Sequence, residues 1–213
     1  PLPFHQRFGL LVERQWLWRE NRALTRRLQS ASFKHKGRME EIDYRHPRKL
    51  KRDQVESLRG GHWIQQARNV LIIGPTGIGK SFLACALGYD ACEHGYRTFY
   101  RYAPKLFREL ENARIDGSLS KLLCKLMKVQ LLIIDDLGIA SATADQYRQL
   151  LEVLDDRGSN GSTLITSQVP VGKWHQMIPD ATVADAILDR LVHTAHRIEL
   201  SGESMRKVKN ARH

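Results

Sequence analysis

The sequence predicts an α/β protein, with a parallel sheet flanked by helices and a basic all-α segment in front of it. Short apolar runs alternate with longer helical patterns after residue 63, as expected for strands that helices cover on both faces. A glycine-rich turn joins the first apolar run to the helical pattern after it. Positive charge is concentrated before residue 63, with 15 Lys and Arg against 7 Asp and Glu.

Length and composition agree with one ordinary domain plus an appendage, since the chain has 213 residues and 42% of them are hydrophobic. We expect a small basic helical domain at residues 1–57 and the main α/β domain at 58–213. Because the chain begins at Pro1 without an initiator Met, we also expect it to be part of a longer protein. No membrane-spanning run or signal-peptide pattern is present, which indicates a cytoplasmic protein without a membrane partner.

The cysteines and histidines give no metal signal. Cys85, Cys92 and Cys124 lack ligand spacing, and their odd number predicts reduced core thiols. His193 and His196 come closest to a ligand pair but have no third ligand nearby in the sequence.

The net charge of +11 is unevenly distributed, with +8 over residues 1–62 and +3 over the remainder. A basic appendage on a nearly neutral domain predicts an arm that binds a polyanion such as nucleic acid. The alternative is an ordinary solvated basic surface.

The N-terminal segment predicts one helix over residues 6–29, because it lacks Gly and Pro after its first turn. Its apolar stripe is imperfect and consists of Leu10, Trp16, Leu17, Trp18, Ala23 and Leu24, with arginines crowding the rest of the surface. Residues 32–52 are polar, basic and weakly periodic, which predicts short helices or a linker.

In the main domain, predicted strands alternate with predicted helices. Strands are expected at 69–73, 97–102, 130–136, 162–168 and 196–200. Helices are expected at 80–94, 104–114, 117–128, 143–157 and 179–195. This order predicts a five-stranded parallel sheet with an extra helix between the second and third strands.

The stretch GPTGIGKS, Gly74 to Ser81, fits the phosphate-binding motif G-x-x-x-x-G-K-[ST] at a strand-to-helix junction. Its glycines let backbone N–H groups surround phosphate oxygens, and the helix N-terminus adds partial positive charge. Lys80 is expected to reach the β- and γ-phosphates, and the Ser81 hydroxyl to ligate Mg²⁺. The residues expected to contact nucleotide are Gly74, Pro75, Thr76, Gly77, Ile78, Gly79, Lys80, Ser81 and Phe82.

The stretch LLIIDDLG, Leu131 to Gly138, ends a buried strand in two acids. In nucleotide hydrolases with such a loop, a carboxylate at this strand end faces the metal, which is the role expected of Asp135. Asp136 stands where an acid that orients or deprotonates the attacking water is needed. The alternative for Asp136 is a helix N-cap or a loop carboxylate.

These stretches, with TLITSQVPVGKW, AILDRLVHTAHRIEL and GESMRK, are similar to the AAA+ ATPases of the initiator and helicase-loader branch. The closest resemblance is to the IstB-like transposition helper ATPases. It covers nearly the whole chain and implies an AAA+ P-loop core, ATP and Mg²⁺ as cofactors, and a transposase as partner. Because the chain ends soon after GESMRK, the C-terminal helical lid of many AAA+ proteins is expected to be absent.

The resemblance also implies roles for particular residues. Either Ser167 or Gln168, at the end of the fourth strand, is the polar sensor between the acids and the γ-phosphate. Asp136 is one methylene shorter than the Glu that relatives often carry. Arg190 matches an arginine finger that acts on a neighbouring subunit, or instead pairs with Asp185 or Asp189 on its own helix. Arg206 resembles a sensor arginine, with a simple basic tail as the alternative.

In the initiator branch, the inserted helix after the second strand faces a central channel and touches DNA. Together with the basic arm, this predicts DNA contacts from Arg22, Arg26, Arg27, Lys34, Lys36, Arg48, Lys49, Lys105, Arg108, Arg114, Lys121 and Lys125. Trp63 borders the adenine or packs against the sheet.

The sequence therefore predicts an ATP-dependent, DNA-binding homo-oligomer, a ring or spiral, that holds duplex DNA with little sequence preference and assists a transposase. The alternatives are a replicative helicase loader and a nucleotide-gated scaffold with little hydrolysis.

Overall fold

The computed structural model describes residues 3–193 and 195–205 and is built on one parallel sheet. Its strands are β1 (Val70–Ile73), β2 (Thr98–Tyr102), β3 (Leu131–Leu137), β4 (Ser162–Ser167) and β5 (His196–Glu199). They lie in the order β2-β3-β4-β1-β5, and every neighbouring pair is parallel. The expected five-stranded parallel sheet is confirmed.

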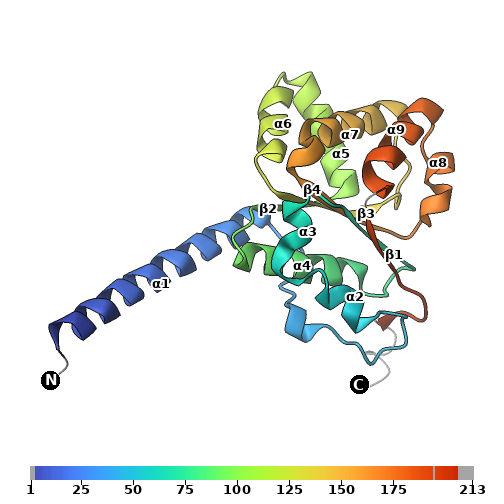
Figure 1. Cartoon of the computed structure of the whole chain (residues 1–213). Helices are drawn as coiled ribbons and strands as arrows, with labels where there is room; N and C mark the ends of the chain where they lie inside the picture. Colours follow the sequence, from blue (N-terminus) through green and yellow to red (C-terminus); the bar gives the residue numbers. More distant parts are fainter. Residues whose placement is uncertain (1–2, 194, 206–213) are drawn as a thin grey trace.

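Helices cover both faces of this sheet (Figure 1). One face carries α5 (Ala103–Ile115), α6 (Leu119–Met127), α7 (Ala144–Arg157), α8 (Trp174–Met177) and α9 (Ala181–Val192). The other carries α2 (Arg52–Glu56), α3 (His62–Gln65) and α4 (Lys80–Glu93). Alternate residues of β3 enter the two cores: Leu132 and Ile134 face the first, and Leu131 and Ile133 face the second.

Because the strands are parallel, the residues expected to form the site lie at one edge of the sheet. The phosphate-binding loop follows β1, the two acids end β3, and Ser167 ends β4. Since β1 pairs with β4 and β4 with β3, these three ends meet at one edge of the sheet. A backbone hydrogen bond of 3.1 Å from Gly74 N to Ser167 O ties the loop to the end of β4. Ligand sites in open α/β sheets lie at this carboxyl edge.

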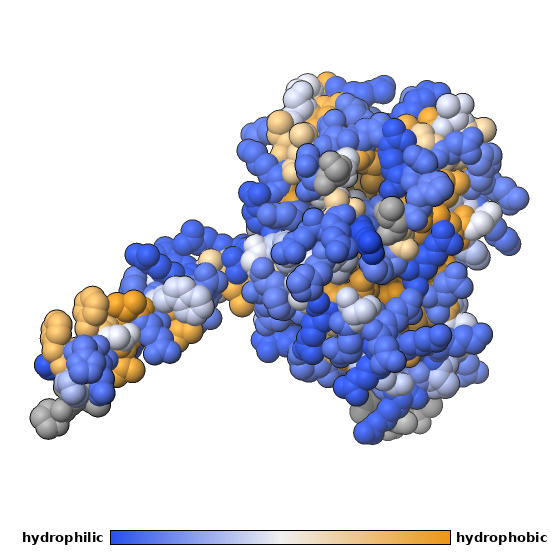
Figure 2. Space-filling view, in the orientation of Figure 1, coloured by the Kyte–Doolittle hydropathy of each residue, from blue (hydrophilic) through white to orange (hydrophobic). Residues whose placement is uncertain are grey.

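The N-terminal helix α1 (Phe4–Ala31) is longer than expected and projects from the body of the protein (Figure 1). Its last turns pack near β2 and α4, and Ala31 is its one buried residue. Most of the expected apolar stripe faces solvent, since Trp16 is 61% exposed and Trp18 53%, whereas Ala23 and Leu24 are half-buried. Figure 2 shows hydrophobic side chains gathered along this projecting helix.

The segment after α1 packs on the main domain rather than hanging from it. It contains the short helices η1 (Met39–Glu41), α2 and η2 (Arg59–Gly61). Met39, Ile42 and Val55 share one hydrophobic core with β1 and α4. The core is therefore continuous across residue 57, where the sequence pattern changes.

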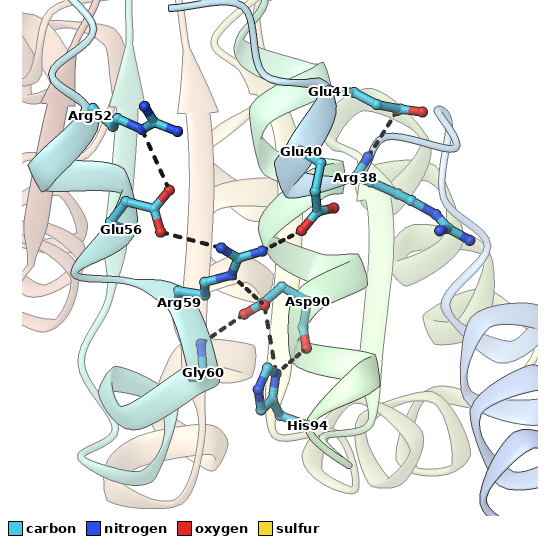
Figure 3. Close-up of polar contacts among 9 residues, drawn as sticks. All are labelled: Arg38, Glu40, Glu41, Arg52, Glu56, Arg59, Gly60, Asp90 and His94. Atoms are coloured by element: carbon cyan, nitrogen blue, oxygen red, sulfur yellow. Dashed lines mark hydrogen bonds and ion pairs between the residues drawn. The ribbon is translucent and has the colours of Figure 1, made fainter.

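Arg59 joins this segment to α4 through charge (Figure 3). Its guanidinium pairs with Glu40, with Glu56 at 3.4 Å and with Asp90 at 3.9 Å. Asp90, a buried residue of α4, also accepts a 2.9 Å hydrogen bond from Gly60 N. These contacts hold the segment against the helix that begins at the phosphate-binding loop.

Three smaller expectations also have outcomes. Trp63 is 4% exposed, donates from Nε1 to Leu58 O over 2.9 Å and packs in the core with β1, so it does not border an adenine. Cys85 and Cys92 are buried thiols, but Cys124 is exposed, so the expectation of three core cysteines is wrong for Cys124. Within 3–193 and 195–205, every helix is too short or too polar to cross a membrane.

Candidate nucleotide site

The phosphate-binding loop occupies the turn between β1 and α4. Gly77 has φ of +80° and Gly79 has φ of +95°, which is the left-handed region that favours glycine. A Cβ at Gly77 would collide with Ser204, and one at Gly79 would collide with Arg48. Gly79 is the N-cap of α4, so the first N–H groups of that helix are directed at the loop.

A cavity of about 840 Å³ opens beside this loop, within the range of small-molecule sites. Six of the nine residues expected to contact nucleotide line it, namely Thr76, Gly77, Gly79, Lys80, Ser81 and Phe82. Gly74, Pro75 and Ile78 do not line it: Gly74 and Ile78 are buried, and Pro75 is exposed. The remaining wall consists of Lys34, His35, Glu41, Asp43, Arg48, Tyr100, Tyr102, Asp136, Ile139 and Met205.

Lys80 is 5% exposed and donates from Nζ to Pro75 O over 3.0 Å. Burial lowers the pKa of the Lys80 ammonium, and the nearby charges of Asp136 and Asp135 oppose that shift. The loop thus places one cation beside the two acids, in the position from which a P-loop lysine reaches phosphate oxygens.

Asp135 is fully buried and held by two hydroxyl groups. Thr166 Oγ1 donates to its Oδ1 over 2.6 Å, and the Tyr100 hydroxyl donates to its Oδ2 over 2.5 Å. Burial and the hydrogen bond to Asp135 raise the pKa of Tyr100, so the phenol stays protonated and remains a donor.

Asp136 adopts the left-handed region, with φ of +59°, at a register shift between Ile134 and Leu137. Successive side chains of a regular strand point to opposite faces. At this bulge they converge instead, because Lys34 Nζ lies 3.7 Å from Asp135 Oδ2 and 4.0 Å from Asp136 Oδ2. The backbone N–H of Asp136 also donates to Thr166 Oγ1 over 2.8 Å.

The donor set fits Mg²⁺. Ser81 and Asp135 offer hard oxygen atoms, and Mg²⁺ binds through one or two such ligands together with phosphate oxygens and water. The Lys34 ammonium beside both carboxylates shows that this place accommodates a cation. No cluster of three or more His, Cys, Asp or Glu side chains occurs in the described part of the chain.

The two sensor candidates have different surroundings. The Ser167 hydroxyl is buried, donates to Leu137 O over 2.6 Å and accepts from Val169 N over 3.0 Å, so it holds strand ends together. Gln168 Oε1 accepts a 2.7 Å hydrogen bond from the Thr76 hydroxyl. Of the two, Gln168 is the side chain that contacts the phosphate-binding loop.

Arg190 lies near the end of α9 and pairs with Asp155 of α7, not with Asp185 or Asp189 as the alternative expected. Its Nη1 also donates to Ala186 O over 2.9 Å. Arg206 lies outside the described residues. Just before it, Met205 N donates to Gly77 O over 3.0 Å, so the start of the stretch GESMRK runs along the phosphate-binding loop.

Two residues expected to bind DNA belong to the nucleotide site instead. Arg48 is 1% exposed and donates from Nη1 to Ile78 O over 2.9 Å and from Nη2 to Asp43 O over 2.8 Å. Arg48 therefore holds the phosphate-binding loop from inside the protein, and its buried guanidinium cannot contact a DNA backbone. Lys34 faces the two acids.

Most other expected DNA contacts are exposed, on α1, on the segment after it or on the α5–α6 pair: Arg22, Arg26, Lys36, Lys49, Lys105, Arg108, Arg114, Lys121 and Lys125. Arg27 is partly buried, because its Nε donates to Cys92 O over 2.8 Å.

The sequence interpretation missed Thr166 and Tyr100, which hold Asp135. A signal was present, since each is a hydroxyl-bearing residue within an expected strand. Their roles depend on register, because Tyr100 and Thr166 belong to the strands on either side of β3.

Comparisons with known proteins point the same way. The family model of the IstB-like ATP binding proteins matches residues 1–213. An insertion sequence ATP-binding protein of Sinorhizobium fredii, y4pL, is 50% identical over 199 residues, covering 93% of this chain and 81% of that one. The IS1162 ATP-binding protein of Pseudomonas fluorescens is 42% identical over 170 residues, covering 79% and 74%.

Solved structures support the fold. The crystal structure of DnaI aligns with a TM-score of 0.64 at 20% identity, over 78% of this chain and 91% of that one. AMPPCP-bound DnaA from Aquifex aeolicus aligns with a TM-score of 0.66 at 18% identity, over 85% and 55%. This chain therefore has the AAA+ fold of these neighbours, and no helical domain follows β5 within the residues described up to 205.

Proposed function

The chain belongs to the IstB-like ATP-binding protein family, and on that premise we propose that it hydrolyses ATP, assembles on duplex DNA and assists the transposase of an insertion sequence. The observation that carries the hydrolytic part is the bulge at the end of β3. It brings two adjacent carboxylates together within 4.0 Å of Lys34 Nζ, with Asp136 lining the cavity beside the phosphate-binding loop, where a regular strand would turn one of the two acids away.

In this proposal the loop binds the triphosphate through backbone N–H groups and the Lys80 ammonium. Bound Mg²⁺, held by Ser81 and Asp135, would neutralise charge on the β- and γ-phosphates. Thr166 and Tyr100 fix the orientation of Asp135 through their hydroxyl groups. Asp136 orients the attacking water and accepts its proton. Gln168 contacts the γ-phosphate and so couples the presence of that phosphate to the end of β4.

Arg190 acts in trans on the nucleotide of a neighbouring subunit, which makes hydrolysis depend on assembly. Within one chain its guanidinium pairs with Asp155 at the surface, and its side chain is 38% exposed. Assembly then replaces that exposed pair with a contact to the neighbour's phosphate, at a modest cost because surface ion pairs contribute little.

A mixing experiment tests this arrangement. Asp136→Asn and Arg190→Ala variants should each release little phosphate in the presence of ATP and duplex DNA. Mixed in equal amounts, they should recover about a quarter of wild-type activity, because that share of head-to-tail interfaces combines an intact acid with an intact arginine. If the mixture stays as inactive as its components, Arg190 does not act across an interface.

Phosphate release by the wild type, with and without duplex DNA, separates the proposal from its alternatives. DNA-stimulated release supports the helper ATPase. ATP binding with no release under either condition would favour the nucleotide-gated scaffold. A replicative helicase loader would bind a helicase through residues 1–57, so co-purification with a replicative helicase instead of the transposase would contradict the proposed partner.

A further inference from the structure

We propose that Lys34 is a resident counter-ion of the acid pair, which closes the metal position to a divalent cation that arrives without a nucleotide. The acid pair is Asp135 and Asp136 at the end of β3. The inference rests on the proposed ATP site and adds a rule for how that site admits metal: the divalent ion enters together with the triphosphate.

Lys34 belongs to the segment that follows α1, not to the sheet that carries the acids. Its Nζ lies 3.7 Å from Asp135 Oδ2 and 4.0 Å from Asp136 Oδ2. Among the described residues, no other Lys or Arg lies within 4.0 Å of the Asp135 carboxylate. The Lys34 ammonium therefore occupies the place at which a cation meets both carboxylates.

Asp135 needs a counter-charge because its carboxylate is fully buried. The hydroxyl groups of Thr166 and Tyr100 donate hydrogen bonds to it but carry no charge. Burial lowers the pKa of the Lys80 ammonium and both acids oppose that shift, so Lys80 brings a second positive charge to the site. Two carboxylates thus lie near two ammonium groups, and the acid pair is neutralised before any metal arrives.

The backbone around Lys34 is fixed against α4, which makes the position of the ammonium part of the fold. Phe33 packs so closely on α4 that a Cβ at Gly88 would lie 2.6 Å from its ring. Gly37 approaches the first turn of α4, where its Cβ would lie 3.0 Å from the Phe82 ring. Lys34 stands between these two contacts and lines the nucleotide cavity.

The Lys34 side chain can leave the acids without moving that backbone. It is 41% exposed, so its ammonium has a path from the cavity to water. The Tyr102 ring, whose centroid is 5.8 Å from Nζ, holds it only weakly. Exchange of the ammonium for a divalent ion thus requires a change of side-chain torsion angles and no rearrangement of the fold.

Charge decides when that exchange is favourable. A divalent ion that enters alone adds two positive charges to a neutralised site, or drives the Lys34 ammonium into water without a new partner. A triphosphate brings several negative charges, so the divalent ion and the displaced ammonium both find anionic partners. Lys34 therefore makes metal binding depend on the nucleotide.

Metal binding without nucleotide tests this role, with Mn²⁺ as the probe and electron paramagnetic resonance of the free ion as the readout. Lys34→Met should bind Mn²⁺ about tenfold more tightly than the wild type, because an ammonium no longer competes for the carboxylates. Lys34→Arg keeps the charge and should behave as the wild type. Lys36→Met removes the same charge from an exposed neighbour and should leave Mn²⁺ binding unchanged.

A second substitution locates the bound ion. Asp135→Asn in the Lys34→Met background should abolish the gain in Mn²⁺ affinity, and circular dichroism checks that this double variant is folded. Asp136→Asn in the same background should reduce the gain and serves as the test if the buried substitution prevents folding. A gain that survives in the folded double variants would place the ion elsewhere and overturn the inference.

Thermal unfolding separates a counter-ion from an ordinary structural contact. Without metal or nucleotide, Lys34→Met should melt below the wild type, because a buried carboxylate has lost its ion pair. Added Mg²⁺ should raise the melting temperature of Lys34→Met and leave that of the wild type nearly unchanged, since a ligand stabilises the state that binds it. Equal melting shifts in both proteins would contradict the counter-ion role.

The outcomes distinguish this inference from the proposed function. A wild type that binds Mn²⁺ alone as tightly as Lys34→Met, and still binds ATP with Mg²⁺, overturns the counter-ion and leaves the ATP site standing. A wild type that binds no ATP in the presence of Mg²⁺ overturns both.

Discussion

Thr166 donates its hydroxyl hydrogen to Asp135 across 2.6 Å, and the same oxygen accepts the backbone N–H of Asp136 across 2.8 Å. One side chain of β4 therefore fixes both acids at the end of β3. The bulge leaves the backbone N–H of Asp136 without a regular strand partner, and Thr166 supplies one. We infer that Thr166 is a positioning residue for the acid pair.

Thr166→Val should lower the free energy of unfolding by about 2 kcal/mol, because it leaves a buried acceptor and a backbone donor unsatisfied. ATP-dependent phosphate release should fall while ATP affinity changes little. Thr163→Val is the matched control: Thr163 lies on the same strand, is 2% exposed, and no described partner hydrogen-bonds to its side chain. Urea unfolding and single-turnover hydrolysis measure both effects, and equal destabilisation by the two variants would contradict this role.

Asp136 should respond differently to two substitutions, because its φ is +59°. Asparagine tolerates the left-handed region, whereas alanine costs about 1 kcal/mol there. Asp136→Asn should retain the wild-type melting temperature and ATP binding but lose hydrolysis. Asp136→Ala should lose hydrolysis and also melt at a lower temperature. Hydrolysis that survives in both variants would show that the carboxylate does not act on the water.

Lys34 should compete with Mg²⁺, because its ammonium lies within 4.0 Å of both acids. Two such charges interact by about 1 to 4 kcal/mol over this distance, with the smaller figure fitting a partly exposed lysine. Lys34→Met should therefore lower the Mg²⁺ concentration needed for half-maximal binding of a fluorescent ATP analogue by about fivefold. Lys36→Met, an exposed neighbour, is the control. An unchanged Mg²⁺ requirement in Lys34→Met would rule out this competition.

Arg48 should matter for nucleotide and not for DNA. It is buried and bonds the carbonyl oxygen of Ile78 inside the phosphate-binding loop. Arg48→Met should weaken ATP binding about tenfold, equivalent to about 1.4 kcal/mol, and leave the salt dependence of DNA binding unchanged. Lys49→Met removes the same charge from the next, exposed residue and should spare ATP affinity. Isothermal titration calorimetry with ATP measures the difference, and a shallower salt slope in Arg48→Met would restore its expected DNA role.

Burial raises the pKa of the Cys85 thiol to about 11, so folding favours the protonated form. An unfolded thiol loses its proton near pH 8.5. This group therefore costs no stability below that pH, and stability falls as the pH rises toward 11, by up to about 1.4 kcal/mol per unit. Cys85→Ala should show a smaller decrease between pH 9 and 11 than the wild type in denaturant unfolding. Parallel curves would show that Cys85 does not titrate in this way.

Much of the molecule followed from local patterns. The strand and helix order, the loop at Gly74–Ser81 and the position of the acids at a strand end could all be predicted, because apolar periodicity and glycine placement act over a few residues. The predicted N-terminal helix is also present in the structure. Helix propensity is a local property of the residues, so it can be read without knowing what the helix packs against. Periodicity identifies an apolar face of a helix but not what covers that face. The sequence therefore could not predict that most apolar residues of this helix are exposed to solvent.

Pairing across the sheet was not predictable in the same way. Asp135 is held by Thr166 and Tyr100 because the strands lie in the order β2-β3-β4 and because β3 contains a bulge. A run of apolar residues in the sequence reveals neither feature. The burial of Arg48 depends on residues 39–58 packing against α4, which a polar and weakly periodic stretch conceals.

By itself the sequence determined where the glycine-rich loop and the two adjacent acids lie, because both are specified by residues adjacent in the chain. Only the tertiary structure decided which side chains hydrogen-bond to those acids and which cationic side chains are buried or paired. Burial and pairing are set by contacts between residues distant in sequence, as between Arg48 and Ile78 or Lys34 and Asp135.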